Sequence, residues 1–285
     1  MFEGFSLQSI DTGEATIRVR VGGSGRPIML LHGHPRTHTT WEWVAPRLSD
    51  RFTVVCPDLR GYGGSSKPPT DEHHEPYSKR AMARDCISIM NQLGHERFAI
   101  VGHDRGAYVA FRSALDFPDR VTKLAVLDAV PIGEAFARCN AQFAMEWWHW
   151  FFFAQPAPRP ERAILADPDT WYNVSPEHKS DEAFEDYRNA IHDADTVHAM
   201  IEDYRAGASI DRTHDEEDRA SGKKLRCPLL VVWATRDDME RLYGDPVNVW
   251  RPWADDIRGK AIASGHHMAE EAPEVLAETL HEFFS

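Results

Sequence analysis

The chain has 285 residues, of which 42% are hydrophobic, and a formal net charge of −13 at pH 7. This length is sufficient for one large α/β core with an inserted cap, and the acidity makes nucleic acids and anionic membrane surfaces poor partners. The sequence has no N-terminal signal pattern and no apolar stretch long enough to span a bilayer, so we expect a cytoplasmic protein.

The first half of the chain alternates between strand and helix patterns. A helical segment such as Tyr77 to Leu93 separates strand-like runs, and this alternation is typical of a mostly parallel sheet. The predicted strands cover Ala15 to Val21, Pro27 to Leu31, Phe52 to Cys56, Phe98 to Val101 and Leu124 to Leu127.

The second predicted strand ends in the turn His32-Gly33-His34-Pro35. A His-Gly turn at the end of such a strand can supply one backbone N–H of an oxyanion hole. We assign that donor to His34. The glycine-rich loop from Asp58 to Ser66 follows the next strand and carries no catalytic prediction.

The strand that begins at Phe98 breaks into Gly102-His103-Asp104-Arg105-Gly106, and a helical pattern follows. This is the pattern of a nucleophile elbow, with aspartate in place of the usual serine, and it requires small residues on both sides of the nucleophile. A carboxylate nucleophile attacks saturated carbon and leaves an alkyl ester on the protein. Halide displacement and epoxide opening both suit it, and the backbone N–H of Arg105 would be the second oxyanion donor.

The base is predicted from Ser264-Gly265-His266, which follows a short strand pattern near the C-terminus. Two carboxylates could orient His266: Asp128 at the tip of its strand, which we place first, and Asp237 at the tip of the next core strand, which stays as the alternative. The neighbouring Asp238 is interpreted as a solvated loop residue.

Residues 132–225 lose the strand signal and indicate a helical cap, with core segments at 1–131 and 226–285. An insertion at this point would cover the carboxyl ends of the strands and therefore Asp104. The acidic run from Asp211 to Asp218 is interpreted as a solvated loop of the cap. The four cysteines are isolated singles without metal-ligand spacing, and the predicted chemistry needs neither a metal nor an organic cofactor.

With Gly-His-Asp-Arg-Gly, His-Gly-His-Pro, Leu-Asp-Ala-Val-Pro and Ser-Gly-His in this order, the chain resembles the haloacetate and fluoroacetate dehalogenases of the α/β-hydrolase superfamily. The resemblance extends to the cap segments Trp148-His149-Trp150 and Glu202-Asp203-Tyr204-Arg205. It implies Asp104 as nucleophile, His266 as base and Asp128 as its partner. It also implies Arg105 on the substrate carboxylate, a homodimer, and three donors to the departing halogen, namely His149, Trp150 and Tyr204.

The chain departs from the family pattern at Tyr108, where the family has a second arginine. Arg105 and Tyr108 share a helix face, so the substrate carboxylate would meet one charge and one hydroxyl, and its affinity should drop. His34 and Arg36 are also unusual, and we expect them to bring positive charge into the loop beside the site.

The sequence therefore predicts an α/β-hydrolase core with an inserted helical lid, acting as a hydrolytic dehalogenase on small 2-haloacids of the haloacetate type. An aspartyl ester forms first, and water activated by His266 then hydrolyses it. The alternative is an epoxide hydrolase, because those enzymes carry an acid at the position of Asp237, with Tyr204 and either Tyr172 or Tyr187 as ring-opening phenols. A ligand-binding relative without turnover is the second alternative.

Overall fold

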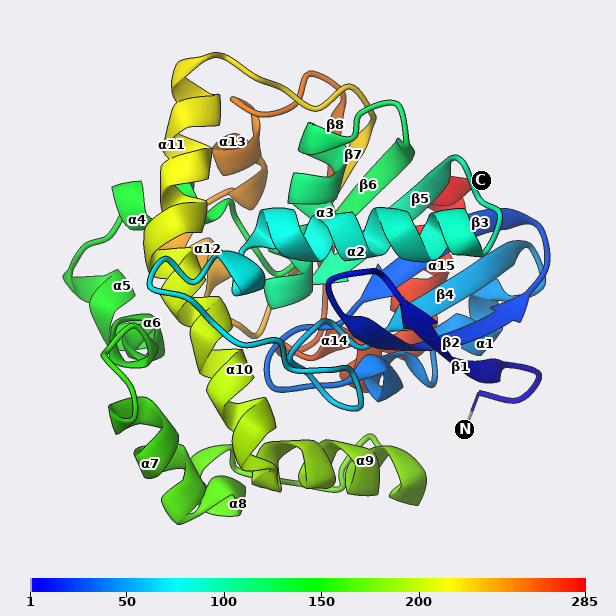
Figure 1. Cartoon of the computed structure of the whole chain (residues 1–285). Coiled ribbons are helices and arrows are strands. Elements are labelled where there is room, and N and C mark those ends of the chain that lie inside the picture. The colour runs from blue at the N-terminus through cyan, green and yellow to red at the C-terminus, as the bar shows by residue number, and fades with distance from the viewer. Residues whose placement is uncertain (1) are drawn as a thin grey trace.

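A computed structural model describes residues 2–285. Its centre is an eight-stranded sheet with the order β1-β2-β4-β3-β5-β6-β7-β8 (Figure 1). The first two strands run antiparallel to their neighbours, and every pairing from β4 onward is parallel. The mostly parallel sheet is confirmed. The strands are β1 (Ser6–Asp11), β2 (Thr16–Gly23), β3 (Arg26–Leu31), β4 (Phe52–Pro57), β5 (Phe98–His103), β6 (Val121–Leu127), β7 (Leu229–Ala234) and β8 (Ile257–Ile262).

The edge strand β1 is absent from the sequence-based prediction. Only Ile10 is buried among its six residues, so the strand lacks the apolar alternation that marks a half-buried strand. Its extended form depends on the ladder that it makes with β2.

Helices cover both faces of the sheet. Successive side chains of a strand point to opposite faces, and β3 shows this directly: Met29 and Leu31 belong to one apolar cluster, whereas Ile28 and Leu30 belong to the other. The first cluster is completed by α2 (Lys79–Gln92), α3 (Arg105–Asp116) and α13 (Pro246–Trp250), and the second by α1 (Ala45–Leu48), α14 (Met268–Glu271) and α15 (Pro273–Phe284).

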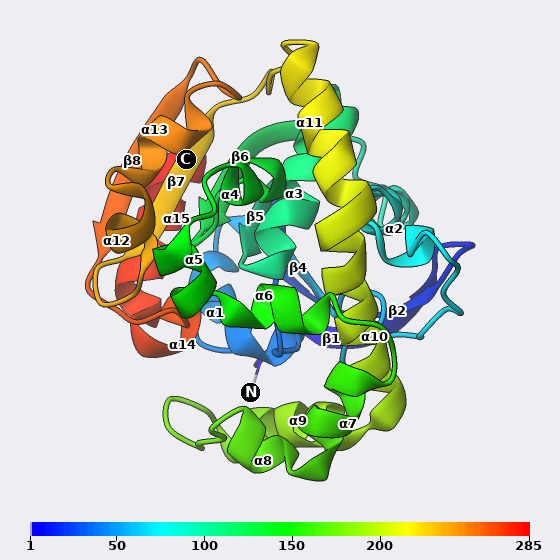
Figure 2. The same cartoon turned by 90° about the vertical axis from the view of Figure 1, so that its left-hand side faces the viewer.

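The chain between β6 and β7 is helical throughout its regular segments and lies beside the sheet rather than on one of its faces (Figures 1 and 2). Figure 2 shows α10 and α11 as a long upright stack, with α7, α8 and α9 below and α4, α5 and α6 in front. The inserted helices are α4 (Ile132–Ala137), α5 (Ala141–Glu146), α6 (Trp148–Phe153), α7 (Arg159–Ala166), α8 (Pro168–Trp171), α9 (Asp181–His192), α10 (Ala194–Ala206), a π-helical turn (Gly207–Asp211) and α11 (Arg212–Ala220).

The remaining helical elements are α12 (Met239–Tyr243), which follows β7, and two 3₁₀ turns at His38–Trp41 and Glu75–Tyr77. Within residues 2–285, none of the helices combines the length and the apolarity that crossing a membrane requires.

The acidic run from Asp211 to Asp218 is not a solvated loop, and that prediction was wrong. The run forms the end of the π-helical turn and most of α11, and Asp211, Asp215 and Asp218 are buried. Their spacing of four and three residues places them on one helix face. This face packs on buried cations: Arg112 lies 2.6 Å from Asp215 and also pairs with Asp218.

The cap is fastened to the core along α9. Arg18 on β2 binds both carboxylate oxygens of Asp186, at 2.7 and 2.9 Å, and Thr37 donates to the same carboxylate at 2.7 Å. Glu42 accepts from the backbone N–H of Ser180 at 2.9 Å, just before α9 begins. These contacts fix one corner of the cap over the strand ends.

Candidate active site

Four predicted site residues meet at the carboxyl ends of neighbouring strands. Asp104 follows β5, Asp128 follows β6, Asp237 lies beyond β7, and His266 lies beyond β8. In a parallel sheet these ends share one edge, so residues distant in sequence converge there. They line a cavity of about 200 Å³ together with cap side chains, smaller than typical ligand pockets of roughly 300–1,000 Å³. The cavity therefore suits a small molecule.

The backbone at Asp104 has the strained geometry that the elbow motif predicts, with φ 48° and ψ −118°. A Cβ atom on Gly102 would lie 2.2 Å from the carbonyl oxygen of Gly106. A Cβ atom on Gly106 would lie 2.3 Å from the carbonyl oxygen of His32. Larger residues at either position would displace the elbow, so the turn requires glycine on both sides.

The carboxylate of Asp104 rests in the predicted oxyanion hole. Its Oδ1 accepts from the backbone N–H of His34 at 2.7 Å. Burial alone would raise the pKa of Asp104, but the positive potential of His266 and the backbone N–H of Arg105 hold it below its usual value. Asp104 is therefore ionised, and Oδ1 is the oxygen that the His34 N–H binds.

The loop that presents His34 is held by the side chain of His32, which is fully buried. Its Nδ1 lies 2.9 Å from the carbonyl oxygen of Gly33, and its Nε2 accepts from the backbone N–H of Leu59 at 3.0 Å. Burial lowers the pKa of His32, so the neutral ring with the proton on Nδ1 satisfies both contacts.

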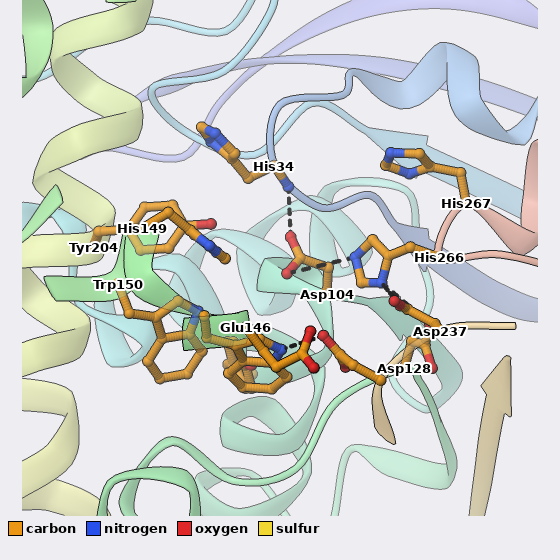
Figure 3. Close-up of a pocket in the computed structure, with 13 residues that line it drawn as sticks. His34, Asp104, Asp128, Glu146, His149, Trp150, Tyr204, Asp237, His266 and His267 are labelled. Carbon is orange, nitrogen blue, oxygen red and sulfur yellow. Dashed lines mark hydrogen bonds and ion pairs between the residues drawn. The ribbon is translucent and has the colours of Figure 1, made fainter. Parts of the chain in front are cut away.

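His266 is placed between the nucleophile and two acids (Figure 3). Its Nε2 lies 4.0 Å from Oδ2 of Asp104. Its Nδ1 lies 2.8 Å from Asp237 and 3.1 Å from Asp128. Burial opposes protonation, but the two acids and the charge of Asp104 raise the pKa of His266 well above its usual value. The structure thus brings both candidate acids to the same nitrogen.

The two acids differ in their surroundings. The side chain of Asp128 is fully shielded from solvent, and burial, with a contribution from the charge of Asp237, raises its pKa to about 7. Asp237 is about a quarter exposed. Burial would raise its pKa, but its hydrogen bond to His266, the charge of His266 and its contact with Asp128 together lower the pKa to about 2. Two adjacent carboxylates favour a single negative charge, and this charge lies on Asp237.

His149, Trp150 and Tyr204 line the cavity, as the resemblance implied. In Figure 3 they stand on one side of Asp104, and His266 stands on the other. Burial lowers the pKa of His149 to about 4, so its ring is neutral. No hydrogen bond joins their N–H and O–H groups to another of the described residues, so these donors are available to a ligand in the cavity.

Arg105, which the resemblance placed on the substrate carboxylate, lies outside the described cavity lining. Its guanidinium is not among the described groups that line the cavity, whereas Tyr108 is. Its Nη2 lies 2.9 Å from Oδ1 of Asp203 and its Nε lies 3.2 Å from Oδ2 of the same residue. Its Cζ lies 4.1 Å from the ring centroid of Tyr204. A buried carboxylate therefore already neutralises this arginine.

The loop after β3 adds no positive charge to the cavity, contrary to our expectation. Arg36 pairs with Glu270 at 2.8 Å and lies 4.4 Å from the ring centroid of Tyr187, outside the described cavity lining. Burial lowers the pKa of His34 to about 3, so its ring is uncharged. Tyr172 and Tyr187, the predicted alternative phenols, also lie outside that lining.

Several cavity residues have no counterpart in the sequence-based prediction, namely Glu146, Trp147, Asp238 and His267. Asp238 accepts from the indole N–H of Trp147 at 2.6 Å. It is half-buried, and burial and the charge of Asp237 raise its pKa to about 6, so its interpretation as a solvated residue was wrong. The Trp147 contact joins residues 91 positions apart, and no local pattern signals such a pair.

Among the described residues, Asp128, Asp237 and His266 also have the spacing of a metal-ligand set, as do Glu161, His198 and Glu202. In the second set, the guanidinium of Arg205 bonds to both glutamates, at 2.7 and 2.6 Å. In the first set, the Nδ1 proton of His266 accounts for the same geometry. The proton on Nδ1 of His266 accounts for the first group and the guanidinium of Arg205 for the second, so the geometry of neither group requires a metal ion.

Comparisons with known proteins agree with this architecture. Residues 26–273 match the family model described as alpha/beta hydrolase fold. A fluoroacetate dehalogenase of a Burkholderia species is 43% identical, over 100% of this chain and 95% of the relative. A soluble epoxide hydrolase of a Corynebacterium species is 31% identical, over 92% of this chain and 91% of the relative. The crystal structure of the protein ALR0039 of Nostoc sp. PCC 7120 superposes with a TM-score of 0.96 at 42% identity, over 100% of this chain and 99% of that one.

Proposed function

Because this chain belongs to the α/β-hydrolase fold family and is related along its whole length to a fluoroacetate dehalogenase, we propose that it is a hydrolytic dehalogenase of small 2-haloacids of the haloacetate type. One observation carries the proposal. The ionised Asp104 faces a small cavity whose far wall holds three uncharged donors without protein partners: His149, Trp150 and Tyr204.

In the first step, Oδ2 of Asp104 attacks the halogen-bearing carbon. The new C–O bond forms as the carbon–halogen bond breaks, and the electron pair leaves with the halide. His149, Trp150 and Tyr204 donate to the departing anion, and donors preorganised for developing charge accelerate such a step. Oδ1 stays in its hydrogen bond to His34 and becomes the carbonyl oxygen of the ester.

The ester changes the state of His266. Alkylation removes the negative charge of Asp104, which had favoured protonation of the nearby imidazole. The pKa of His266 therefore falls, and the ring becomes available as a base. It takes a proton from water, which attacks the ester carbonyl, and the oxyanion forms where His34 and Arg105 already donate. When the oxyanion collapses, the bond between the carbonyl carbon and the alkyl oxygen breaks, the leaving alkoxide takes a proton from His266, and the 2-hydroxyacid and the carboxyl group of Asp104 are released. Asp128 and Asp237 hold the imidazole in the tautomer that this step needs.

Epoxide hydrolysis is a second candidate, favoured by a specific observation. The hydroxyls of Tyr108 and Tyr204 both belong to cavity-lining side chains, and neither has a hydrogen bond to another described residue. Two phenols beside a carboxylate nucleophile could protonate the oxygen of an opening epoxide. This pair differs from the one expected from the sequence, since Tyr172 and Tyr187 lie elsewhere.

The test uses His266→Asn, which can form the ester but cannot hydrolyse it. We expect intact-mass spectrometry to show a covalent adduct after incubation with a haloacid such as chloroacetate, and peptide mapping to place it on Asp104. Asp104→Asn is the matched control and should show neither an adduct nor halide release. An adduct with epoxides alone would favour the second candidate. No adduct with either class would contradict both and leave the non-catalytic relative.

A further inference from the structure

The arginine next to the cavity already has a carboxylate partner within the protein. Arg105 is 1% exposed and is held by Asp203, which is fully buried and also accepts from Lys79 and, at 2.6 Å, from the hydroxyl of Tyr62. Tyr204 lies against the guanidinium and itself lines the cavity. The charge of Arg105 is therefore already balanced within the protein.

The cavity wall is rich in acids. Five carboxyl groups line it, whereas none of the described lining residues is arginine or lysine. Glu146 pairs with Arg241 at 3.0 Å, and burial raises the pKa of Asp128 to about 7, so the negative charge without an arginine or lysine partner lies on Asp104, Asp237 and Asp238. His266 is the protonated imidazole among them, and it is already shared by two acids. Burial keeps His34, His149 and His267 neutral by lowering their pKa values. The five acids are Asp104, Asp128, Glu146, Asp237 and Asp238.

A substrate carboxylate would meet repulsion in such a site, because charges a few ångströms apart in a protein interact strongly. The groups available to its carbonyl end are neutral instead. Tyr108 is 3% exposed and lines the cavity with an unpaired hydroxyl. A phenol can donate to an amide oxygen, and the acidic wall offers acceptors to an amide NH₂, which a carboxylate group cannot use.

We propose that this site takes uncharged 2-haloacid derivatives, above all primary amides such as 2-haloacetamides, and prefers them to the corresponding haloacetates. The inference rests on the proposed dehalogenase function and names its substrate class. Asp104 displaces halide from the haloacetamide to form a carbamoylmethyl ester. Water then releases 2-hydroxyacetamide, so haloacetamide and water give hydroxyacetamide, halide and a proton.

The experiment measures kcat/KM for chloride release from chloroacetamide and chloroacetate by the full chain. Each value is divided by the rate of the same compound with free acetate ion, which removes the difference in intrinsic reactivity. Asp104→Asn serves as the blank, because chloroacetamide also alkylates the exposed thiol of Cys139. We expect the normalised preference for the amide to be about tenfold or more, the effect of one unfavourable charge contact.

Two variants locate the cause of the preference. Asp203→Asn keeps an acceptor for Arg105 but removes the charge, so the KM for chloroacetate should fall and the preference should shrink. Tyr108→Phe leaves the buried ion pair intact and should lower kcat/KM for chloroacetamide more than for chloroacetate. If Asp203→Asn does not fold, Tyr108→Phe still decides the matter.

The outcomes separate the two proposals. A wild-type preference for chloroacetate would overturn this inference while supporting the dehalogenase function. Halide release from neither compound would contradict the function itself. Equal losses on both compounds in Tyr108→Phe would show that this hydroxyl does not face the carbonyl end, and would overturn the inference as argued here.

Discussion

The indole N–H of Trp147 donates to Asp238 over 2.6 Å, and this bond joins the inserted helices to the loop after β7 at the wall of the cavity. Nearby, Arg241 of α12 lies 3.0 Å from Glu146 of α5. Cap and core thus share a wall whose charge depends on Asp238.

The protonation state of Asp238 should affect the KM for an anionic substrate. Its pKa of about 6 means that it is ionised at pH 8 and protonated at pH 5. As the pH falls through 6, one negative charge leaves the wall, and the KM for chloroacetate should fall by about tenfold or less. In Asp238→Asn, which still accepts from Trp147, only the protonation of Asp128, whose pKa is about 7, remains, so the KM should be lower at pH 8 and should vary less with pH. A KM profile from pH 5 to 8 with the same slope in both proteins would contradict the role of Asp238.

Asp128 and Asp237 should act as partly interchangeable acids, because both accept from Nδ1 of His266. We expect Asp128→Asn or Asp237→Asn alone to slow ester hydrolysis modestly. The double variant should lose on the order of 10⁴-fold, as triads do without their acid. Single-turnover mass spectrometry of ester decay measures this directly. If one single variant is as slow as the double variant, that residue is the sole acid.

Tyr108→Arg should add a cation to the cavity. Tyr108 already lines it, so the new guanidinium would meet the substrate, and one charged hydrogen bond contributes about 1.5–3 kcal/mol at best. The KM for chloroacetate should therefore fall, while that for chloroacetamide should change little. Parallel changes on both substrates would mean that this helix face does not meet the carbonyl end.

The buried cluster under α11 should matter for stability. Arg112 is 2% exposed and pairs with Asp215 and Asp218, so Arg112→Ala leaves buried carboxylates unpaired. The free energy of unfolding should drop by about 3–5 kcal/mol. Arg80→Ala is the matched control, because Arg80 also pairs with Asp218 but is a third exposed, and it should cost about 1 kcal/mol or less. Urea unfolding distinguishes the two, and similar losses would contradict the assignment.

The core fold could be predicted from the sequence because its central strands are continuous apolar runs and the turns that carry the candidate catalytic residues are local. The elbow at Asp104, the oxyanion turn at His34 and the Gly265-His266 turn each lie within a few residues and need little tertiary information. The choice between Asp128 and Asp237 as the acid, in contrast, could not be made from a local motif. It depends on the register of β6 and β7, which places both strand tips beside one imidazole.

Charge partners were the least predictable part. The resemblance implied that Arg105 binds a substrate carboxylate, but its partner Asp203 lies 98 residues away in the sequence, and only the folded chain brings the two together. The acidic run was misinterpreted for a related reason: Asp211, Asp215 and Asp218 have helical spacing, but the cations that they pair with belong to α2 and α3.

The placement of one acid at each of two neighbouring strand tips has an evolutionary consequence. A lineage that carries both Asp128 and Asp237 can lose either one while an acceptor remains on His266. The acid can thus move between strands without passing through a sequence that lacks it. Descendants of such a chain would catalyse the same reaction. They would differ, however, in whether the catalytic acid follows β6 or β7, and this position is what sequence motifs usually rely on to identify it.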